Sequence, residues 1–197
     1  MQQKNNPDQH IIVLGGAFST GKSTMLEQIR HDFGEKFRYI MDGGRAALET
    51  VAQGRQPEQL TMEELHAVQR LVMEHYAREE GKDDGRLVVS DGSLIEAAAY
   101  SQFVFSTRDM MELNALLRYR DWKQMYTYIK FPTTLPIEYD GVRHSDYVMQ
   151  EVIDKRIDRV LAKNSFPVVR ITSEDFAQRY AQVLKVLFTE DYMHHGR

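Results

Sequence analysis

The sequence contains no cysteine, which excludes disulfide bonds, cysteine-ligated zinc sites and a catalytic thiol. It also has no apolar run that approaches the ~20 residues needed for a membrane-spanning helix. Positive charge is not in excess, because 25 Lys and Arg residues stand against 29 Asp and Glu residues, for a net charge of −4. This balance argues against a general nucleic-acid or membrane-surface binder, although a local basic channel for a polynucleotide stays open.

The N-terminal residues 1–9 are polar, contain Pro7 and lack the apolar core of a signal peptide. We therefore expect a disordered lead-in and a cytoplasmic protein. With 197 residues, 42% of them hydrophobic, the chain is expected to form one domain over residues 10–190, followed by a tail at 191–197. His194 and His195 in this tail form either a weak metal-binding pair or, as is usual at a chain end, a solvated pair.

The most informative pattern is the phosphate-binding loop G-x-x-x-x-G-K-[ST], which residues 16–23 match. The apolar run at 10–14 predicts a buried strand before it, and residues 24–30 have the apolar spacing of a helix. The loop needs this context because it joins a strand to the N-terminus of a helix. The alternative is a plain Gly-rich turn. The predicted nucleotide-binding residues in this segment are Gly16, Ala17, Phe18, Ser19, Thr20, Gly21, Lys22, Ser23 and Thr24.

The residue types of this loop suit the binding of a phosphate chain. Glycines allow the backbone to curve so that several N–H groups point at one phosphate chain, and the helix that follows adds its positive dipole end. Lys22 is a compact charge that can reach the β- and γ-phosphates. Ser23 offers a hydroxyl to Mg²⁺, with Thr24 beside it as a spare. The loop therefore predicts binding of a nucleoside triphosphate with Mg²⁺.

Strands and helices alternate along the rest of the chain. We predict a long helix that opens at Thr61 with a capping box formed with Glu64. The alternation predicts an α/β protein with a parallel five-stranded sheet and helices on both of its faces. Together with the phosphate loop we expect the three-layer P-loop NTPase fold, with a helical lid at about residues 131–163. The further strands are expected at 37–41, 86–92, 123–129 and 166–171, and the helices at 45–53, 61–80, 93–105, 109–122, 146–163 and 173–188.

Two acids follow predicted strands, at the sheet edge where the phosphate loop lies. Asp91 follows a continuous apolar strand and fits the role of a carboxylate that holds Mg²⁺ or its waters; the alternative is a helix cap. Asp42 ends the second strand, and Arg45 comes three residues later. Asp42 is a candidate to accept a proton from a substrate hydroxyl or to orient the substrate, and Arg45 to bind negative charge. The alternative for this pair is a surface ion pair.

Further arginines are candidates for closing over the phosphates. Arg143, in the sequence D-G-V-R at 140–143, is the main one, since an added arginine stabilises the charge that develops during phosphoryl transfer. Arg156 and Arg159 on the next predicted helix are secondary candidates for nucleotide binding, and their alternative is a solvated helix face. Tyr100, together with aromatic residues at 103 and 105, can either stack on a base or fill the core.

Taken together, these motifs resemble those of the NadR-type and related AAA-like P-loop domains, a group that includes ribosylnicotinamide kinase domains and lies close to deoxynucleoside and thymidylate kinases. The resemblance covers about residues 10–190. Residues 15–24 resemble the group's phosphate loop, 42–45 its E-x-x-R motif, and Gln69 with Arg70 its Q-R pair. Residues 90–92 stand where the group has its acid, and 140–143 are similar to its D-G-x-R lid motif.

Two departures accompany this resemblance. The acid of the E-x-x-R motif is Asp42 in this sequence, and its side chain is one methylene shorter than that of Glu. Glu138 and Tyr139 stand before the D-G-x-R motif, where ribosylnicotinamide kinases often have a tryptophan. The resemblance implies catalytic roles for Lys22, Asp42, Arg45, Asp91 and Arg143.

Three functions remain open from the sequence. The first is an ATP- and Mg²⁺-dependent kinase of a nucleoside, a nucleotide or a similar small hydroxylated acceptor. The second is a nucleotide-binding switch with slow hydrolysis, and the third is a kinase of a hydroxyl in a polynucleotide or modified base. No guanine-reading N/T-K-x-D sequence is present, which favours ATP over GTP. Nothing in the sequence indicates the oligomeric state.

Overall fold

The computed structural model describes residues 10–82, 84–101, 126–137 and 146–195. The helix predicted at 109–122 and the D-G-V-R sequence at 140–143 lie outside these residues, as does the end of the helix predicted at 93–105.

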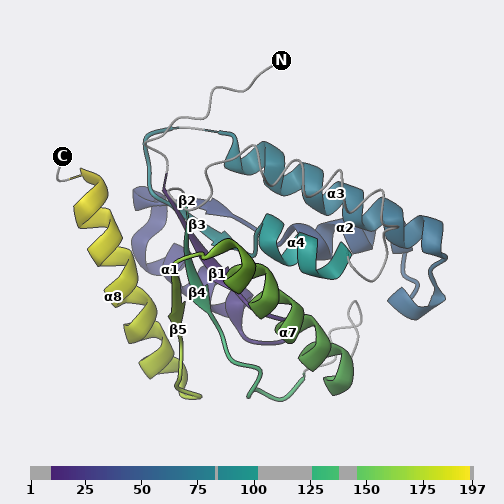
Figure 1. Ribbon diagram of the computed structural model, residues 1–197. Coiled ribbons are helices and arrows are strands. Elements are labelled where there is room, and N and C mark those ends of the chain that lie inside the picture. The colour runs from purple at the N-terminus through teal and green to yellow at the C-terminus, as the bar shows by residue number, and fades with distance from the viewer. Residues whose placement is uncertain (1–9, 83, 102–125, 138–145, 196–197) are drawn as a thin grey trace.

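One sheet of five strands forms the centre of the molecule, and every neighbouring pair of strands is parallel (Figure 1). Its strand order is β2-β3-β1-β4-β5. The parallel five-stranded sheet predicted from the sequence is thus confirmed, and the structure adds the order of the strands. The strands are β1 (Ile11–Gly15), β2 (Arg38–Ile40), β3 (Val88–Asp91), β4 (Tyr126–Lys130) and β5 (Val168–Arg170).

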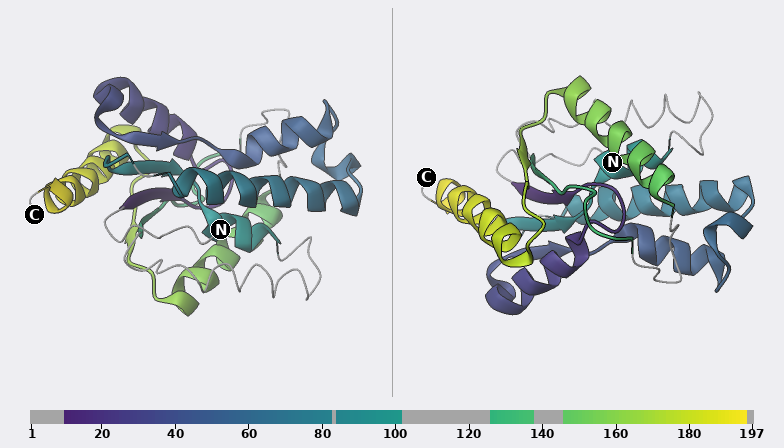
Figure 2. Two further views of the ribbon diagram at one scale, coloured as in Figure 1. Left: turned by 90° about the horizontal axis from the view of Figure 1, so that it is seen from above. Right: turned by 90° about the horizontal axis from the view of Figure 1, so that it is seen from below.

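Helices cover both faces of this sheet, and Figure 2 shows α1 and α7 on opposite sides of it. Between α2 and α3 lies the short 3-10 helix η2, and a second one, η1, follows α1. The helices are α1 (Lys22–Phe33), η1 (Gly34–Lys36), α2 (Gly43–Ala52), η2 (Pro57–Gln59), α3 (Met62–Glu80), α4 (Leu94–Ser101), α7 (Tyr147–Asn164) and α8 (Phe176–His195).

The strand residues divide between two hydrophobic cores because successive side chains of a strand point to opposite faces. In β1, Ile11 and Val13 join the core under α2, α3, α4 and α7, whereas Ile12 and Leu14 join the core under α1 and α8. All four side chains are completely buried. A central parallel strand that is covered on both faces therefore has a continuous apolar sequence, as the run before the loop does.

Local sequence signals explain where several helices begin. The capping box predicted at Thr61 is present: the Thr61 hydroxyl accepts from the backbone N–H of Glu64, and the Glu64 carboxylate accepts from the backbone N–H of Thr61. Asp42 caps α2 with its side chain. By contrast, α1 already begins at Lys22, inside the phosphate-loop motif, and α8 extends to His195, beyond its expected end near residue 188. Helix ends without a strong cap are poorly specified by local sequence.

The segment predicted as a lid contains α7, which packs into the core through Ile153, Ile157 and Leu161. The carboxyl ends of the parallel strands meet at one edge of the sheet, where Gly15, Asp42 and Asp91 follow or end β1, β2 and β3. Ligands of open α/β sheets bind at this edge. None of the helices in the described part of the chain is long and apolar enough to cross a membrane.

Candidate active site

The phosphate loop runs from the end of β1 to the start of α1. Its backbone uses left-handed conformations, with φ of 134° at Gly16, 83° at Gly21 and 55° at Ser19. Such angles suit glycine, whereas Ser19 is one of the few non-glycine residues that adopt them here. No side chain of the described residues caps α1, whose N-cap is Gly21. A helix start of this kind presents backbone N–H groups to an anion.

Lys22 folds back over this loop. Its ammonium group donates to the backbone carbonyl of Ala17 at 2.6 Å and to the Thr20 hydroxyl at 3.2 Å, and only 8% of the residue is exposed. Two oxygen atoms of the loop thus bind the Lys22 ammonium group, which is the group predicted to bind phosphate. A bound phosphate would offer the ammonium charged oxygens in place of these neutral ones, which are weaker acceptors.

Ser23, at the start of α1, meets Asp91 at the end of β3. The Ser23 hydroxyl donates to an Asp91 carboxylate oxygen at 2.5 Å. Asp91 is 2% exposed, and this burial raises its pKa, while the positive charge of Lys22 acts in the opposite direction. Thr24, the predicted spare hydroxyl, is exposed. The structure therefore pairs Ser23, rather than Thr24, with the carboxylate.

This pair fits Mg²⁺ by the chemistry of its donors. Mg²⁺ prefers hard oxygen ligands, keeps several waters, and is usually bound by one or two carboxylates plus the phosphates of a nucleotide. A hydroxyl and a carboxylate in contact beside the phosphate loop supply that set. Among the described residues no group of three or more His, Asp or Glu side chains could hold a metal ion.

Asp42 has a structural role besides the acceptor-side role predicted from the sequence. Its carboxylate accepts from the backbone N–H groups of Gly44 at 2.8 Å and Arg45 at 3.3 Å, and so caps α2. Its side chain nevertheless lines the chamber described below. Arg45 is exposed, and its charge acts to lower the pKa of Asp91. The structure thus brings Asp42 and Arg45 close to the phosphate loop.

The remaining predicted arginines are Arg143, Arg156 and Arg159. Arg143 lies outside the described residues. Arg156 is partly buried and Arg159 is exposed on α7, and neither lines the chamber. Burial and the nearby Arg159 charge lower the pKa of Arg156.

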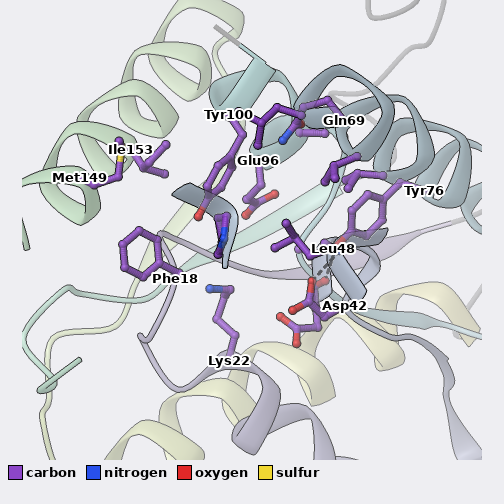
Figure 3. Close-up of a pocket in the computed structure, with 18 of the residues that line it drawn as sticks. Phe18, Lys22, Asp42, Leu48, Gln69, Tyr76, Glu96, Tyr100, Met149 and Ile153 are labelled. Atoms are coloured by element: carbon purple, nitrogen blue, oxygen red, sulfur yellow. Dashed lines mark hydrogen bonds between the residues drawn. The ribbon is translucent and has the colours of Figure 1, made fainter. Parts of the chain in front are cut away.

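A chamber of about 460 Å³ opens beside the loop, between it and helices α2, α3, α4 and α7 (Figure 3). Figure 3 shows Lys22 and Asp42 at one end of it and Gln69 at the other, whereas the Tyr100 side chain points from α4 toward the loop, where its hydroxyl lies at the backbone of Phe18. Phe18, from the phosphate loop, lies on the same side as Met149 and Ile153 of α7. One cavity therefore joins the phosphate-binding loop to a space large enough for a small organic molecule.

Three buried polar side chains form hydrogen bonds to the loop backbone, and none of them was predicted from the sequence. Glu96 of α4 accepts from the backbone N–H of Gly16 at 3.2 Å, Gln150 of α7 donates to the Phe18 carbonyl at 2.7 Å, and Arg179 of α8 donates to the Thr20 carbonyl at 3.2 Å. Their exposed fractions are 6%, 2% and 2%. The only local signal was a single acid in the apolar sequence of α4, since buried charges are rare unless paired.

Glu96 belongs to a small network beneath the loop. Its carboxylate also accepts from the Ser93 hydroxyl at 2.6 Å and from the Tyr128 hydroxyl. The ring of Tyr128 lies against Gly15, where an added Cβ would fall well inside van der Waals contact. Gly15 is thus required by the close approach of β4 to the chain just before the loop.

Arg179 connects three segments at the opposite side of the loop. Besides the Thr20 carbonyl, its guanidinium donates to the Ser173 carbonyl at 2.6 Å and to the Thr134 hydroxyl at 3.3 Å. Burial lowers the pKa of this arginine, while the negative charge of Glu174 acts against the shift. The planar guanidinium can hold several acceptors in fixed geometry, which suits it to fixing the backbone of the loop.

Comparison with known proteins agrees with this geometry. The family model described as an AAA domain matches residues 11–179. Among solved structures, NadR in complex with NR has a TM-score of 0.70 at 19% identity, over 93% of this chain and 52% of NadR. The chain thus spans about half the length of that protein. No curated protein sequence matches this chain.

Two shorter proteins match along almost their whole length. Thymidylate kinase from Candida albicans has a TM-score of 0.66 at 12% identity, covering 92% of each chain. Deoxyadenosine kinase from M. mycoides has a TM-score of 0.59 at 13% identity, covering 91% of this chain and 99% of its own. At such low sequence identities, these similarities show a shared fold. The family model matches most of the sequence, and this chain therefore belongs to the AAA domain family of P-loop proteins.

Proposed function

We propose that this protein is a phosphotransferase that uses ATP and Mg²⁺ to phosphorylate a hydroxyl group of a nucleoside, a nucleotide or a similar small acceptor. The observation that carries the proposal is the single chamber that joins the phosphate loop to an acceptor-sized volume. A switch protein needs a nucleotide site but no such volume beside the reacting phosphate. The solved NadR complex with NAD and AMP-PNP, a structure similar to this chain, supports the choice of ATP.

In this proposal the loop amides and Lys22 bind the phosphates of ATP, and Ser23 and Asp91 hold Mg²⁺. When bound, Mg²⁺ neutralises negative charge on the transferred phosphoryl group. Most of the rate in such reactions comes from positioning and electrostatic stabilisation. Glu96, Gln150 and Arg179 would contribute indirectly, since they fix the loop backbone that carries the donating groups.

On the acceptor side, Asp42 is the proposed group that accepts a hydrogen bond, and then a proton, from the attacking hydroxyl. It lines the chamber at the end where Lys22 lies (Figure 3). Arg45 is proposed to balance the charge of this carboxylate and of Asp91. Arg143, Arg156 and Arg159 remain predicted phosphate-binding residues, of which Arg143 is the one proposed to close over the nucleotide.

The direct test is ATP turnover measured by coupled ADP release, with a panel of nucleosides and nucleotides as acceptors. The proposal expects at least one acceptor to stimulate ADP release, with one phosphorylated product formed per ADP. Phosphorylated product should be identified by mass spectrometry so that plain hydrolysis is not mistaken for transfer. Tight ATP binding with slow turnover that no acceptor changes would instead identify a switch.

A further inference from the structure

The walls of the acceptor chamber are apolar, although its end beside the phosphate loop is charged. Side chains from four helices form these walls, and they include Leu48 of α2, Val68 and Val72 of α3, and Met149 and Ile153 of α7. Val68 and Val72 are 4% and 6% exposed, so they belong to both the wall and the core. A ligand gains affinity from such walls by burying apolar surface, and a polar ligand would lose its water without replacement.

Polar groups at the far end of the chamber are few. Gln69 is the amide there, and its side-chain oxygen accepts from the Ser101 hydroxyl at 3.4 Å. The phenol of Tyr100 points away from this end toward the backbone of Phe18 in the phosphate loop, and burial together with the charge of Glu96 raises its pKa, so the phenol remains protonated (Figure 3). The far end therefore offers the neutral amide of Gln69 rather than a charge for a phosphate.

Charge along the chamber is mostly negative. The lining includes the carboxylates of Asp42, Glu58, Asp91 and Glu96, whereas Lys22 is the one cationic side chain among the lining residues that the structure describes. Lys22 lies on the phosphate loop, where the proposed function assigns it to ATP. A second phosphate group carried by the acceptor would enter a confined space whose walls cannot replace its hydration.

We propose, on the basis of the phosphotransferase function above, that the acceptor is an alcohol without a phosphate group, whose non-reacting part is an aromatic or other apolar body. The acceptor hydroxyl lies at the end of the chamber with Lys22 and Asp42 (Figure 3). The apolar body fills the part of the chamber that residues such as Leu48, Val68 and Met149 line. In this proposal the protein phosphorylates alcohols that carry no phosphate group, and it differs in this from kinases whose acceptor is a nucleoside monophosphate.

Three matched probes test this assignment: 2′-deoxyuridine, 5-phenyl-2′-deoxyuridine and the 5′-monophosphate of the phenyl compound. Binding is measured by calorimetry with the full chain in saturating non-hydrolysable ATP analogue and Mg²⁺, so that the nucleotide site is filled. We expect the phenyl nucleoside to bind about tenfold more tightly than deoxyuridine, or better, because the added ring is buried. We expect its monophosphate to bind at least about tenfold more weakly than the phenyl nucleoside.

A pair of isosteric variants identifies the chamber as the place of binding. Val68→Thr adds a hydroxyl to the apolar wall, whereas Val183→Thr makes the same change at a completely buried position of α8, in the core on the other side of the sheet. Val68→Thr should reduce the advantage of the phenyl probe over deoxyuridine several-fold. Val183→Thr should lower thermal stability but leave that ratio unchanged.

The outcomes separate this inference from the proposed function. Tighter or equal binding of the monophosphate, no gain from the phenyl ring, or no binding of either nucleoside would each overturn the inference. ADP release stimulated by a nucleoside monophosphate would overturn it as well, yet would support the phosphotransferase function. Tight binding of the phenyl nucleoside without any transfer from ATP would support an apolar site and refute the phosphotransferase function.

Discussion

The two halves of the proposed active site are built in different ways. The phosphate loop is one continuous segment that offers backbone groups and Lys22, and buried polar side chains of α4, α7 and α8 hold it in place. The acceptor chamber is made of side chains from α2, α3, α4 and α7, and most of these side chains are apolar. One half is therefore fixed by directional hydrogen bonds, and the other by packing.

This difference implies that the two halves can be changed separately. Backbone amides cannot be replaced by substitution, so the loop tolerates little variation in its geometry. Apolar walls can change volume and shape while the sheet and the loop stay in place. We therefore expect variants of the loop and its supports to act mainly on ATP, and variants of the chamber to act mainly on the acceptor.

The largest effect is expected for Lys22→Ala. Loss of the ammonium group removes the charge that is proposed to stabilise the transferred phosphoryl group, so kcat/KM should fall by at least about a hundredfold. ADP release and calorimetric binding of an ATP analogue measure the effect. Lys155→Ala is the control, because Lys155 is exposed on α7 and pairs with Glu151. Equal activities of the two variants would contradict the role of the loop.

Asp91→Asn should come next, with a fall in kcat/KM of about a hundredfold and a shift of the Mg²⁺ dependence to higher concentration. Asparagine keeps the shape of the side chain but removes the charge that a divalent ion needs. Activity is measured as a function of Mg²⁺, and EDTA should abolish the activity of the wild type. An unchanged Mg²⁺ dependence would show that the ion is held elsewhere.

Gly15→Ala tests how closely the chain before the loop is packed. The new methyl group would collide with the Tyr128 ring, which should lower the free energy of unfolding by about 1–3 kcal/mol. Urea denaturation measures the change. The double variant Gly15→Ala with Tyr128→Leu should be less destabilised than the sum of the two single changes, because the collision is absent from it. Strict additivity would argue against this contact.

Arg179→Gln should weaken ATP binding about tenfold while it leaves acceptor binding unchanged. The variant loses charged donors to the Thr20 and Ser173 carbonyls, and the loop backbone is then less well held. Arg170→Gln is the matched control, since Arg170 is exposed and pairs with Asp158 at 2.9 Å. If Arg179→Gln weakened ATP and acceptor equally, the separation of the two halves would fail.

The smallest effect is expected for Leu48→Ala, which enlarges the chamber without touching the loop. The KM for an acceptor should rise a few-fold, and ATP affinity should stay unchanged. Leu71→Ala serves as the control because Leu71 lies on α3, is exposed and does not line the chamber. A change in ATP affinity with Leu48→Ala would show that the two halves are coupled.

Local sequence predicted the features of the protein that depend on neighbouring residues. The strand, loop and helix around Lys22 follow from glycine positions and apolar spacing, and the capping box at Thr61 follows from two residues three positions apart. The α/β alternation predicted the parallel sheet, which the structure confirms. The family resemblance is confirmed as well, by the match over residues 11–179.

The supports of the loop were not predictable in this way. Glu96, Gln150 and Arg179 lie far along the chain from the loop residues they contact, and their roles depend on where α4, α7 and α8 pack. Asp42 shows a related difficulty, because its position after a strand indicated a possible base, whereas the structure also gives its carboxylate a capping role.

The sequence by itself determined the phosphate-loop motif, the alternation of strands and helices, and the residues proposed to bind ATP and Mg²⁺. These depend on backbone conformation and on side chains within a few positions of one another. The order of the strands, the buried polar supports and the apolar chamber were decided only by the tertiary structure, because packing distant helices onto one sheet creates contacts that no local pattern contains.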